Sequence, residues 1–258
     1  MKNKHTIQIN PEACIGCGLC QQDCPASNIR VENKKARILT QECIMCGHCA
    51  AVCPKAAVSL TGFDNPPEEI GRPTLLDPDT LLNAVKTRRS IRQFTNQTVS
   101  PEILRQIIEA GRLTPTGGNA QDVSFIVLNK EIDRFEKMAA GLFRRLLPLM
   151  KLVNPMARRT VIDDHFFFKS APAAIVISSK DEVNGALAAA NMELMAEACG
   201  LGVLYSGFFS MAANRSGSLR RMLGLSRGEK AVTTLVLGYS AVKYHRTVQK
   251  EAAAVRYL

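Results

Sequence analysis

The sequence predicts an α+β protein made of two domains of different character. Eight of its nine cysteines fall within the first 60 of 258 residues. A stretch rich in proline and glycine follows, from Gly62 to Pro73, and is typical of a linker. Beyond it, segments with helix patterns alternate with short strand-like runs. We therefore expect domains at 1–62 and 79–258, joined by a linker at 63–78.

The secondary structure follows from local patterns in each part. In the first part we expect short strands at 7–9, 29–31, 37–39 and 58–60. In the second part, Ser100-Pro101-Glu102 predicts a helix start, since it combines a capping hydroxyl, proline at the first helical position and an acid. Gly111 can end that helix. We also expect strands at 123–128, 173–177, 203–205 and 231–237, and a helix at 184–199.

The cysteines form two copies of one pattern, 29 residues apart. The first copy runs from Cys14 to Pro25 and the second from Cys43 to Pro54, each with the spacing C-x2-C-x2-C-x3-C-P. Bacterial ferredoxins that bind two [4Fe–4S] clusters have this spacing. Glycines at positions 16, 18 and 47 let the backbone turn close to a cubane.

Each copy is expected to supply three ligands to one cluster and one to the other. Three thiolates two residues apart on a tight loop can hold three corners of a cubane, and the fourth cysteine points away. Cluster one is expected to use Cys14, Cys17, Cys20 and Cys53. Cluster two is expected to use Cys43, Cys46, Cys49 and Cys24.

Other interpretations of the cysteines are weaker. Disulfides are rare in proteins that are not exported. Zinc sites favour pairs of C-x2-C, with four cysteines to a site. His48 lies inside the second copy and is interpreted as a spacer residue, while Cys199 follows an apolar helical pattern and is expected in the core.

Charge and hydropathy bear on partners and location. The formal net charge of +10 is computed with neutral cysteines, whereas two clusters with thiolate ligands would remove roughly four units of it. The basic residues are scattered without an aromatic-rich stripe, so we expect no nucleic-acid partner. No apolar run is long enough to cross a bilayer, and the basic start is not followed by a signal-peptide hydrophobic region. We expect a cytoplasmic protein with no membrane partner.

The second part resembles a known family in four blocks. They are Lys86 to Phe94, Pro115 to Gln121, Leu201 to Phe208, and Leu237 to Tyr239 followed by Lys243 to Arg246. In this order, across residues 79–258, they resemble the blocks of the nitroreductase family of flavoproteins, here with an N-terminal two-cluster ferredoxin domain. The resemblance implies an α+β domain with a central, mostly antiparallel sheet flanked by helices. It also implies FMN bound at the interface of a homodimer.

The first block has a chemical reason of its own to hold a phosphate. It places three guanidinium groups and a hydroxyl within five residues, which suits planar forks and short hydrogen bonds. A solvated basic turn is the alternative. The resemblance implies that the phosphate, ribityl chain or pyrimidine edge meets Arg88, Arg89, Ser90, Arg92 and Arg246.

The other blocks complete the implied flavin site. Thr116, Gly117 and Asn119 would reach in from the partner subunit, while Ser206 and Gly207 would lie beside the ring edge. No catalytic side chain is expected, because the reaction occurs at flavin N5, assisted by the backbone N–H of Gly207. Two departures concern substrate preference and nicotinamide use: Ser206 stands where members often have an acid, and Gly117-Gly118 where small hydroxylic residues are more usual.

These features predict an FMN-dependent oxidoreductase. Its acceptors would be nitroaromatics, quinones or activated alkenes, and its electrons would come through the clusters from a ferredoxin, from NAD(P)H, or from both. An electron relay to a protein partner, without turnover of small molecules, is the alternative, and a flavin-binding sensor is a third. No Rossmann or P-loop glycine pattern supports a dedicated nucleotide domain.

Overall fold

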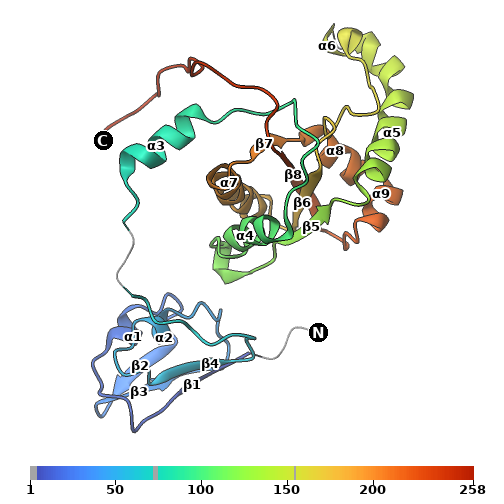
Figure 1. Ribbon diagram of the computed structural model, residues 1–258. Helices are drawn as coiled ribbons and strands as arrows, with labels where there is room; N and C mark the ends of the chain where they lie inside the picture. Colours follow the sequence, from blue (N-terminus) through green and yellow to red (C-terminus); the bar gives the residue numbers. More distant parts are fainter. Residues whose placement is uncertain (1–4, 72–74, 154) are drawn as a thin grey trace. The chain divides into compact units, whose positions relative to one another are not determined.

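The computed structural model describes residues 5–71, 75–153 and 155–258. The expected linker is therefore described except for residues 72–74, and the basic start except for residues 1–4. Contacts divide the chain into two units (Figure 1). The first unit comprises residues 1–75 with 117–120, and the second comprises residues 76–116 and 121–258.

The first unit consists of two small antiparallel sheets and two one-turn helices. Strand β1 (Thr6–Ile9) pairs with β4 (Val58–Thr61), and β2 (Ile29–Glu32) pairs with β3 (Lys35–Ile38). Helices α1 (Leu19–Gln22) and α2 (His48–Ala51) each follow a left-handed glycine. The sequence repeat thus reappears in three dimensions, since each copy contains two strands, one cysteine loop and one short helix.

The core of the first unit is small and includes several of the cysteines themselves. Ile7, Ile29, Ala57 and Val58 are buried together with Cys14, Cys20 and Cys49. Few large apolar side chains are present, because strands of four residues can each bury only one or two. A unit of this size usually needs a covalent or metal staple in addition to its core.

The second unit is built on one four-stranded sheet with the order β5-β6-β8-β7. The strands are β5 (Ser124–Leu128), β6 (Ala173–Ser179), β7 (Gly202–Tyr205) and β8 (Lys230–Gly238). Each neighbouring pair is antiparallel. The expected α+β fold with a central, mostly antiparallel sheet is confirmed.

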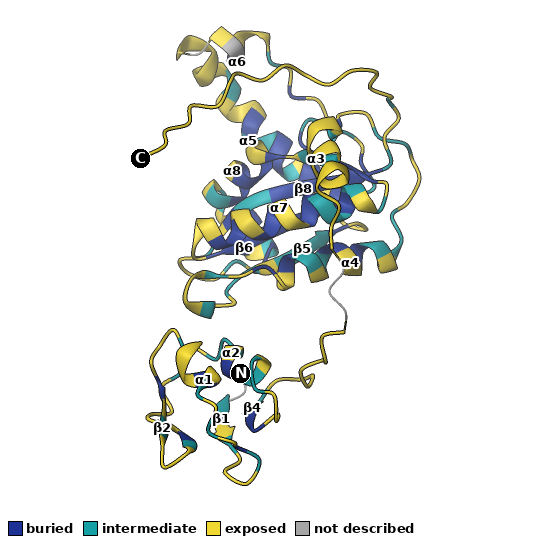
Figure 2. Cartoon of the chain, turned by 90° about the vertical axis from the view of Figure 1, so that its left-hand side faces the viewer, coloured by how far each residue is buried: buried dark blue, intermediate teal, exposed yellow. Residues whose placement is uncertain are grey.

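Helices cover both faces of this sheet. Ala174 and Val176 of β6 pack with α5 (Ile132–Val153), α8 (Gly207–Arg215) and α9 (Gly217–Met222). The alternate residues Ile175 and Ile177 pack with α4 (Pro101–Arg112) and α7 (Glu182–Ala198). Because successive strand residues point to opposite faces, β6 is buried along its whole length (Figure 2).

Helix boundaries show which local signals were sufficient. Helix α4 begins as expected, since the Ser100 hydroxyl accepts a hydrogen bond from the Ile103 N–H at 3.3 Å. Asp77 caps α3 (Pro78–Thr87) in the same way. Helices α3, α5, α8, α9 and the short α6 (Pro155–Arg159) were not among the predicted elements. In the described part of the chain, no helix is both long and apolar enough to span a membrane.

A buried carboxylate fixes the segment that leads into β6. Glu136 of α5 is 3% exposed and accepts the backbone N–H groups of Phe167 and Phe168, each at 2.8 Å. Burial raises the pKa of this carboxyl, although both N–H donors oppose the shift. The side chain thereby satisfies two buried donors that no regular secondary structure pairs.

We predict that Glu136→Ala lowers the free energy of unfolding by about 2–4 kcal/mol, because two buried N–H groups lose their acceptor. Glu136→Gln should lose less, since its amide oxygen can still accept. Chemical denaturation followed by circular dichroism measures both. The matched control is Glu131→Ala, which removes an exposed pair with Arg134 and should change stability by at most about 0.5 kcal/mol. Equal losses for Glu136→Ala and Glu131→Ala would contradict the anchoring role.

Candidate functional site

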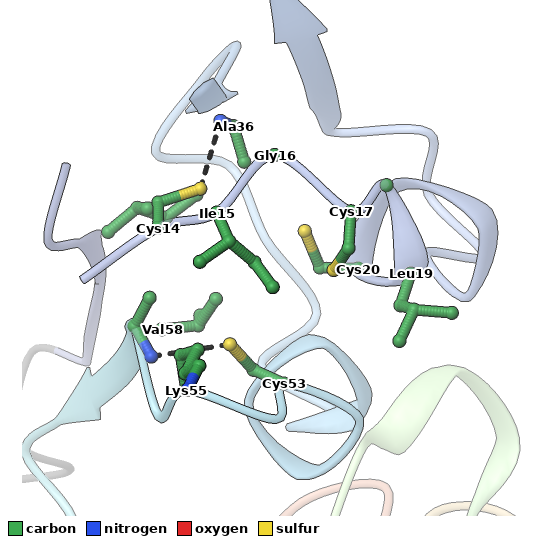
Figure 3. A pocket seen from close by; sticks show the side chains of 13 residues that line it. Cys14, Ile15, Gly16, Cys17, Leu19, Cys20, Ala36, Cys53, Lys55 and Val58 are labelled. Atoms are coloured by element: carbon green, nitrogen blue, oxygen red, sulfur yellow. Dashed lines mark hydrogen bonds between the residues drawn. The ribbon is translucent and has the colours of Figure 1, made fainter. Parts of the chain in front are cut away.

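Four cysteines surround a pocket in the first unit. The pocket is lined by Cys14, Cys17 and Cys20 of the first copy and by Cys53 of the second. Figure 3 shows their sulfur atoms arranged around a common space, with Ile15 between them. The structure thus brings together the four residues that the spacing assigns to cluster one.

A second pocket in the same unit is its counterpart. Its lining includes Cys43, Cys46 and Cys49 of the second copy and Cys24 of the first. His48 also lines this pocket, from the first position of α2. Each pocket therefore contains three cysteines of one copy and one of the other, and ligation of a cluster by each set remains a prediction.

Tight backbone turns position the loops. Gly16 has φ +70°, and a Cβ at this position would collide with the backbone carbonyl of Lys34. Gly18 and Gly47 have φ +81° and +78° and each begins the one-turn helix that carries the third cysteine of its copy. A side chain is thus excluded by contact at Gly16 and disfavoured by conformation at Gly18 and Gly47, which keeps each loop close to its pocket.

The chemistry of both pockets suits anionic sulfur ligands. Backbone N–H groups of Ala36 and Ala57 point at Cys14 and Cys53, at 3.4 and 3.3 Å. In the second pocket, the N–H groups of Asn28 and Met45 point at Cys24 and Cys43, at 3.3 and 3.4 Å. Such donors stabilise thiolates and tune the potential of a bound cluster.

Burial, in contrast, disfavours the thiolate form of the third cysteine of each copy. It raises the pKa of Cys20, and it raises the pKa of Cys49 to about 11. The Ala36 and Gly16 N–H groups instead lower the pKa of Cys14. A buried thiolate needs a positive partner, and cluster iron would provide one. In the part of the chain that the structure describes, no three His, Cys, Asp or Glu side chains are placed for a single ion. A cubane, by contrast, is bound at four separate corners.

The ninth cysteine differs from the prediction. Cys199 was expected in the core, but α7 ends at Ala198 and Cys199 is its half-exposed C-cap residue. Its sulfur lies 3.6 Å from Oε1 of Gln106. The expectation was wrong because the apolar pattern of the helix stops one turn before this position.

The crossed cysteine sets make a prediction that paired substitutions can test. Cys14→Ser with Cys53→Ser should remove one cluster and leave about four irons per chain, because both residues belong to one set. Cys43→Ser with Cys53→Ser should remove both clusters. Iron and sulfide analysis and electron paramagnetic resonance (EPR) of anaerobically purified protein measure the outcome, with Cys199→Ser as the fully loaded control. The reverse pattern of iron loss would show that each copy binds its own cluster.

In the second unit, three of the four sequence blocks converge on the sheet. Ser90 forms a parallel bridge with Val203 of β7, and the Ile91 N–H donates to the Val203 carbonyl at 2.9 Å. Further on, the Thr95 N–H donates to the Tyr239 carbonyl at 2.8 Å. The first block therefore lies between the third and the last, held by backbone hydrogen bonds.

The third block forms the turn from β7 into α8. Ser206 is buried, and its N–H donates to the Thr234 carbonyl of β8 at 2.8 Å. Gly207 is the exposed first residue of α8, and a Cβ built there would meet no atom within 4 Å. Open space beside the Gly207 backbone leaves room for a planar ring at this position.

Arg89 contains an unused donor. Its Nε is buried and has no hydrogen-bond partner among the described residues. The rest of the guanidinium is fixed, since Nη1 donates to the Lys86 and Arg88 carbonyls and Nη2 lies 3.4 Å from the Arg246 carbonyl. A buried, unpaired donor on a charged group is costly, and an anionic ligand group would satisfy it.

Arg88 makes an ion pair that was not among the predicted contacts. Its Nη1 lies 2.9 Å from Oε1 of Glu193 in α7, whose side chain is 10% exposed. The Tyr205 hydroxyl donates to Oε2 of Glu193 at 3.2 Å. Burial, together with Glu193, raises the pKa of both Tyr205 and Glu197. The sequence signal that could have indicated this pair is Glu193 itself, an acid within the Ala- and Met-rich pattern of α7.

The remaining predicted residues are placed as follows. Arg92 is exposed and donates to the Ser90 carbonyl at 3.2 Å, and Arg246 is exposed as well. The Thr116 hydroxyl accepts the Gln121 N–H at 2.9 Å. Gly117–Asn119 forms the 3₁₀ turn η1. Asn119 has φ +54°, a conformation that asparagine tolerates better than most residues.

Comparison with known proteins gives two family matches. Residues 85–239 match the nitroreductase family, and residues 6–54 match a 4Fe-4S dicluster domain. A protein of Methanothermobacter thermautotrophicus, provisionally named as an NADH dehydrogenase/NAD(P)H nitroreductase, is 26% identical over 170 residues, covering 62% of this chain and 78% of that protein. A similarly named protein of Archaeoglobus fulgidus is 27% identical over 169 residues, covering 61% and 84%.

Solved structures share the fold of the second unit. A nitroreductase with bound FMN from Bacteroides fragilis has a TM-score of 0.56 and 20% identity, covering 69% of this chain and 98% of its own. An FMN-dependent nitroreductase from Clostridium difficile has a TM-score of 0.58 and 16% identity, covering 70% and 100%. A nitroreductase with bound FMN from Desulfitobacterium hafniense has a TM-score of 0.57 and 21% identity, covering 68% and 98%.

The fold and the cysteine pockets define a two-domain α+β protein with an N-terminal 4Fe-4S dicluster domain. The nitroreductase match, over residues 85–239, covers more than half of the 258 residues. The chain therefore belongs to the nitroreductase family.

Proposed function

We propose that this protein is an FMN-dependent oxidoreductase that reduces small acceptors, namely nitroaromatics, quinones or activated alkenes. Electrons would reach it through two [4Fe–4S] clusters, from NAD(P)H, or by both routes. The observation that carries the proposal is the presence in one chain of two four-cysteine pockets and a nitroreductase-family domain. Family relatives with bound FMN support the flavin.

The residues of the second unit fit the flavin. FMN accepts one or two electrons, so it can convert single-electron delivery into two-electron reduction. In this proposal the unpaired Nε of Arg89 donates to the phosphate. Arg88 adds a second guanidinium, because its pair with Glu193 uses only one of its five N–H donors. The backbone at Ser206 and Gly207 borders the ring edge.

A second copy of the chain would complete the site. We propose a homodimer in which the partner subunit contributes its own Thr116, Gly117 and Asn119. Arg92, Ser90 and Arg246 would contact the ribityl chain, pyrimidine edge or phosphate from the first subunit. No protein acid is required, since a proton can come from water. The chain's own role is to bind, orient and partly shield the flavin.

The phosphate role of Arg89 predicts a large loss of FMN affinity on substitution. Arg89→Ala should raise the FMN dissociation constant about 10- to 100-fold, as expected for the loss of a charge-assisted hydrogen bond. Titration of flavin-free protein, followed by flavin fluorescence, measures it. Arg105→Ala is the matched control, because Arg105 is an exposed arginine paired with Glu102 on α4. Wild-type affinity in a folded Arg89→Ala protein would remove Arg89 from the site.

The electron route is tested with anaerobically purified protein. We expect about eight irons per chain and FMN, and turnover of nitroaromatics or quinones with NADH, NADPH or reduced ferredoxin. If the clusters carry the electrons, the variant lacking both clusters should lose ferredoxin-driven turnover more severely than NAD(P)H-driven turnover. Full iron and flavin without turnover of any acceptor would favour the electron-relay alternative, and iron well below about eight in loaded protein would contradict the clusters.

A further inference from the structure

The internal repeat of the first unit provides a comparison between its two pockets. Positions 29 residues apart are equivalent, as Cys14 and Cys43 are. Strands β1 and β3 occupy equivalent places and have the same burial pattern, with one fully buried residue at the second position. A charge present at one position and absent at its equivalent therefore distinguishes the environments of the two pockets.

Lys35 is the first such difference. Its Nζ donates to the backbone carbonyls of Pro11 at 2.6 Å and Cys14 at 2.7 Å. The ammonium group is thus held at the first cysteine of the first pocket and is half-buried. The equivalent residue is Thr6, whose hydroxyl instead pairs with that of Thr61 at 2.6 Å.

Lys55 is the second difference. It follows Cys53 by two residues and lines the first pocket, as Figure 3 shows. Its equivalent in the second pocket is Ala26, which lines that pocket in the same way. The first pocket thus has two lysines at positions where the second has a threonine and an alanine.

Acidic residues add to the contrast, though more weakly. Asp23 and Glu42 directly precede Cys24 and Cys43 of the second set, where the first set has Val52 and Ala13. Glu12 lies near Cys14 and is the acid beside the first set. All three acids are exposed, so water and salt screen them more than the half-buried ammonium of Lys35.

Hydrogen bonds to sulfur act in the same direction as the charges, since Gly16 is a further backbone donor at Cys14. Ala36 and Ala57 donate backbone N–H groups to cysteines of the first set, while Asn28 and Met45 do so in the second, all at 3.3–3.4 Å. This influence on potential is of the same kind in both pockets. Charge at equivalent positions is the difference that side-chain substitution can test.

We infer that Lys35, assisted by Lys55, makes the Cys14, Cys17, Cys20 and Cys53 pocket the site where the first electron resides when the protein is reduced. The inference rests on the proposed function, since it requires clusters in both pockets. Each cluster takes one electron from a one-electron reductant, with no bond formed or broken, and gains one unit of negative charge. A nearby ammonium stabilises that added charge.

The size of the effect follows from Coulomb's law. One unit charge several ångströms from the cluster, at high effective dielectric constant, should change the distribution of an electron between the pockets about three- to tenfold. Lys35 should contribute more than Lys55, because Lys55 is exposed. The second pocket then holds its electron at lower potential and passes it on more readily.

Redox titration of anaerobically loaded, full-length protein with dithionite, monitored by EPR, tests the inference. Wild type should show two midpoints. Lys35→Gln should lower the upper midpoint, shifting the electron distribution about three- to tenfold, and leave the lower one in place. Lys35→Arg should resemble wild type because it keeps the charge. Lys34→Gln is the control for net charge, since this neighbouring lysine is exposed.

The repeat also allows the reciprocal experiment. Thr6→Lys and Ala26→Lys place the same charges beside the second pocket and should raise the lower midpoint, so that the two midpoints approach each other. These variants carry the test if Lys35→Gln fails to fold. A single midpoint in wild type, equal shifts of both midpoints, or a shift of the lower midpoint in Lys35→Gln would overturn the inference. Protein without iron would instead contradict the proposed function.

Discussion

The first unit depends on the convergence of cysteine sulfur atoms in two small pockets. Its strands are four residues long and bury few large side chains, so its core consists partly of the cysteines themselves. Each pocket takes one cysteine from the opposite copy of the repeat. Whatever binds in either pocket therefore links the two copies, and binding and folding of this unit are coupled. The sulfur chemistry and the stability of the unit cannot be separated.

The second unit differs, because it has a large apolar core and still leaves the Arg89 Nε without a partner among the described residues. Strand β6 is buried on both faces, and the two layers of helices keep it rigid. The blocks at 88–91 and 203–207 are fixed to this sheet by backbone hydrogen bonds and by the packing of Ile91 and Val203. The exposed backbone at Gly207 and the buried Nε of Arg89, which has no partner among the described residues, thus remain available for a ligand.

Local patterns in the sequence were sufficient for much of this structure. The cysteine sets followed from spacing, since a loop of fixed length limits which sulfurs can face one pocket, and α4 followed from the cap at Ser100. Contacts between distant residues were not predictable in this way. Glu136 with the backbone at Phe167, and Arg88 with Glu193, are both set by how helices pack on the sheet. The same limit explains Cys199, whose exposure depends on where α7 ends.

The proposed cofactor sites help to explain the positive net charge of the chain. A formal charge of +10 would suggest a polyanionic partner, yet some of the basic residues lie at proposed sites for small anionic groups, and others pair with acids on the surface. Lys35 and Lys55 stand at the first cysteine pocket, and Arg88 and Arg89 stand at the end of the sheet. Two clusters with their thiolates would remove roughly four units of that charge, and a flavin phosphate about two more. The proposed cofactors would therefore offset part of the excess positive charge, and its uneven distribution between the pockets can set the order in which electrons occupy them.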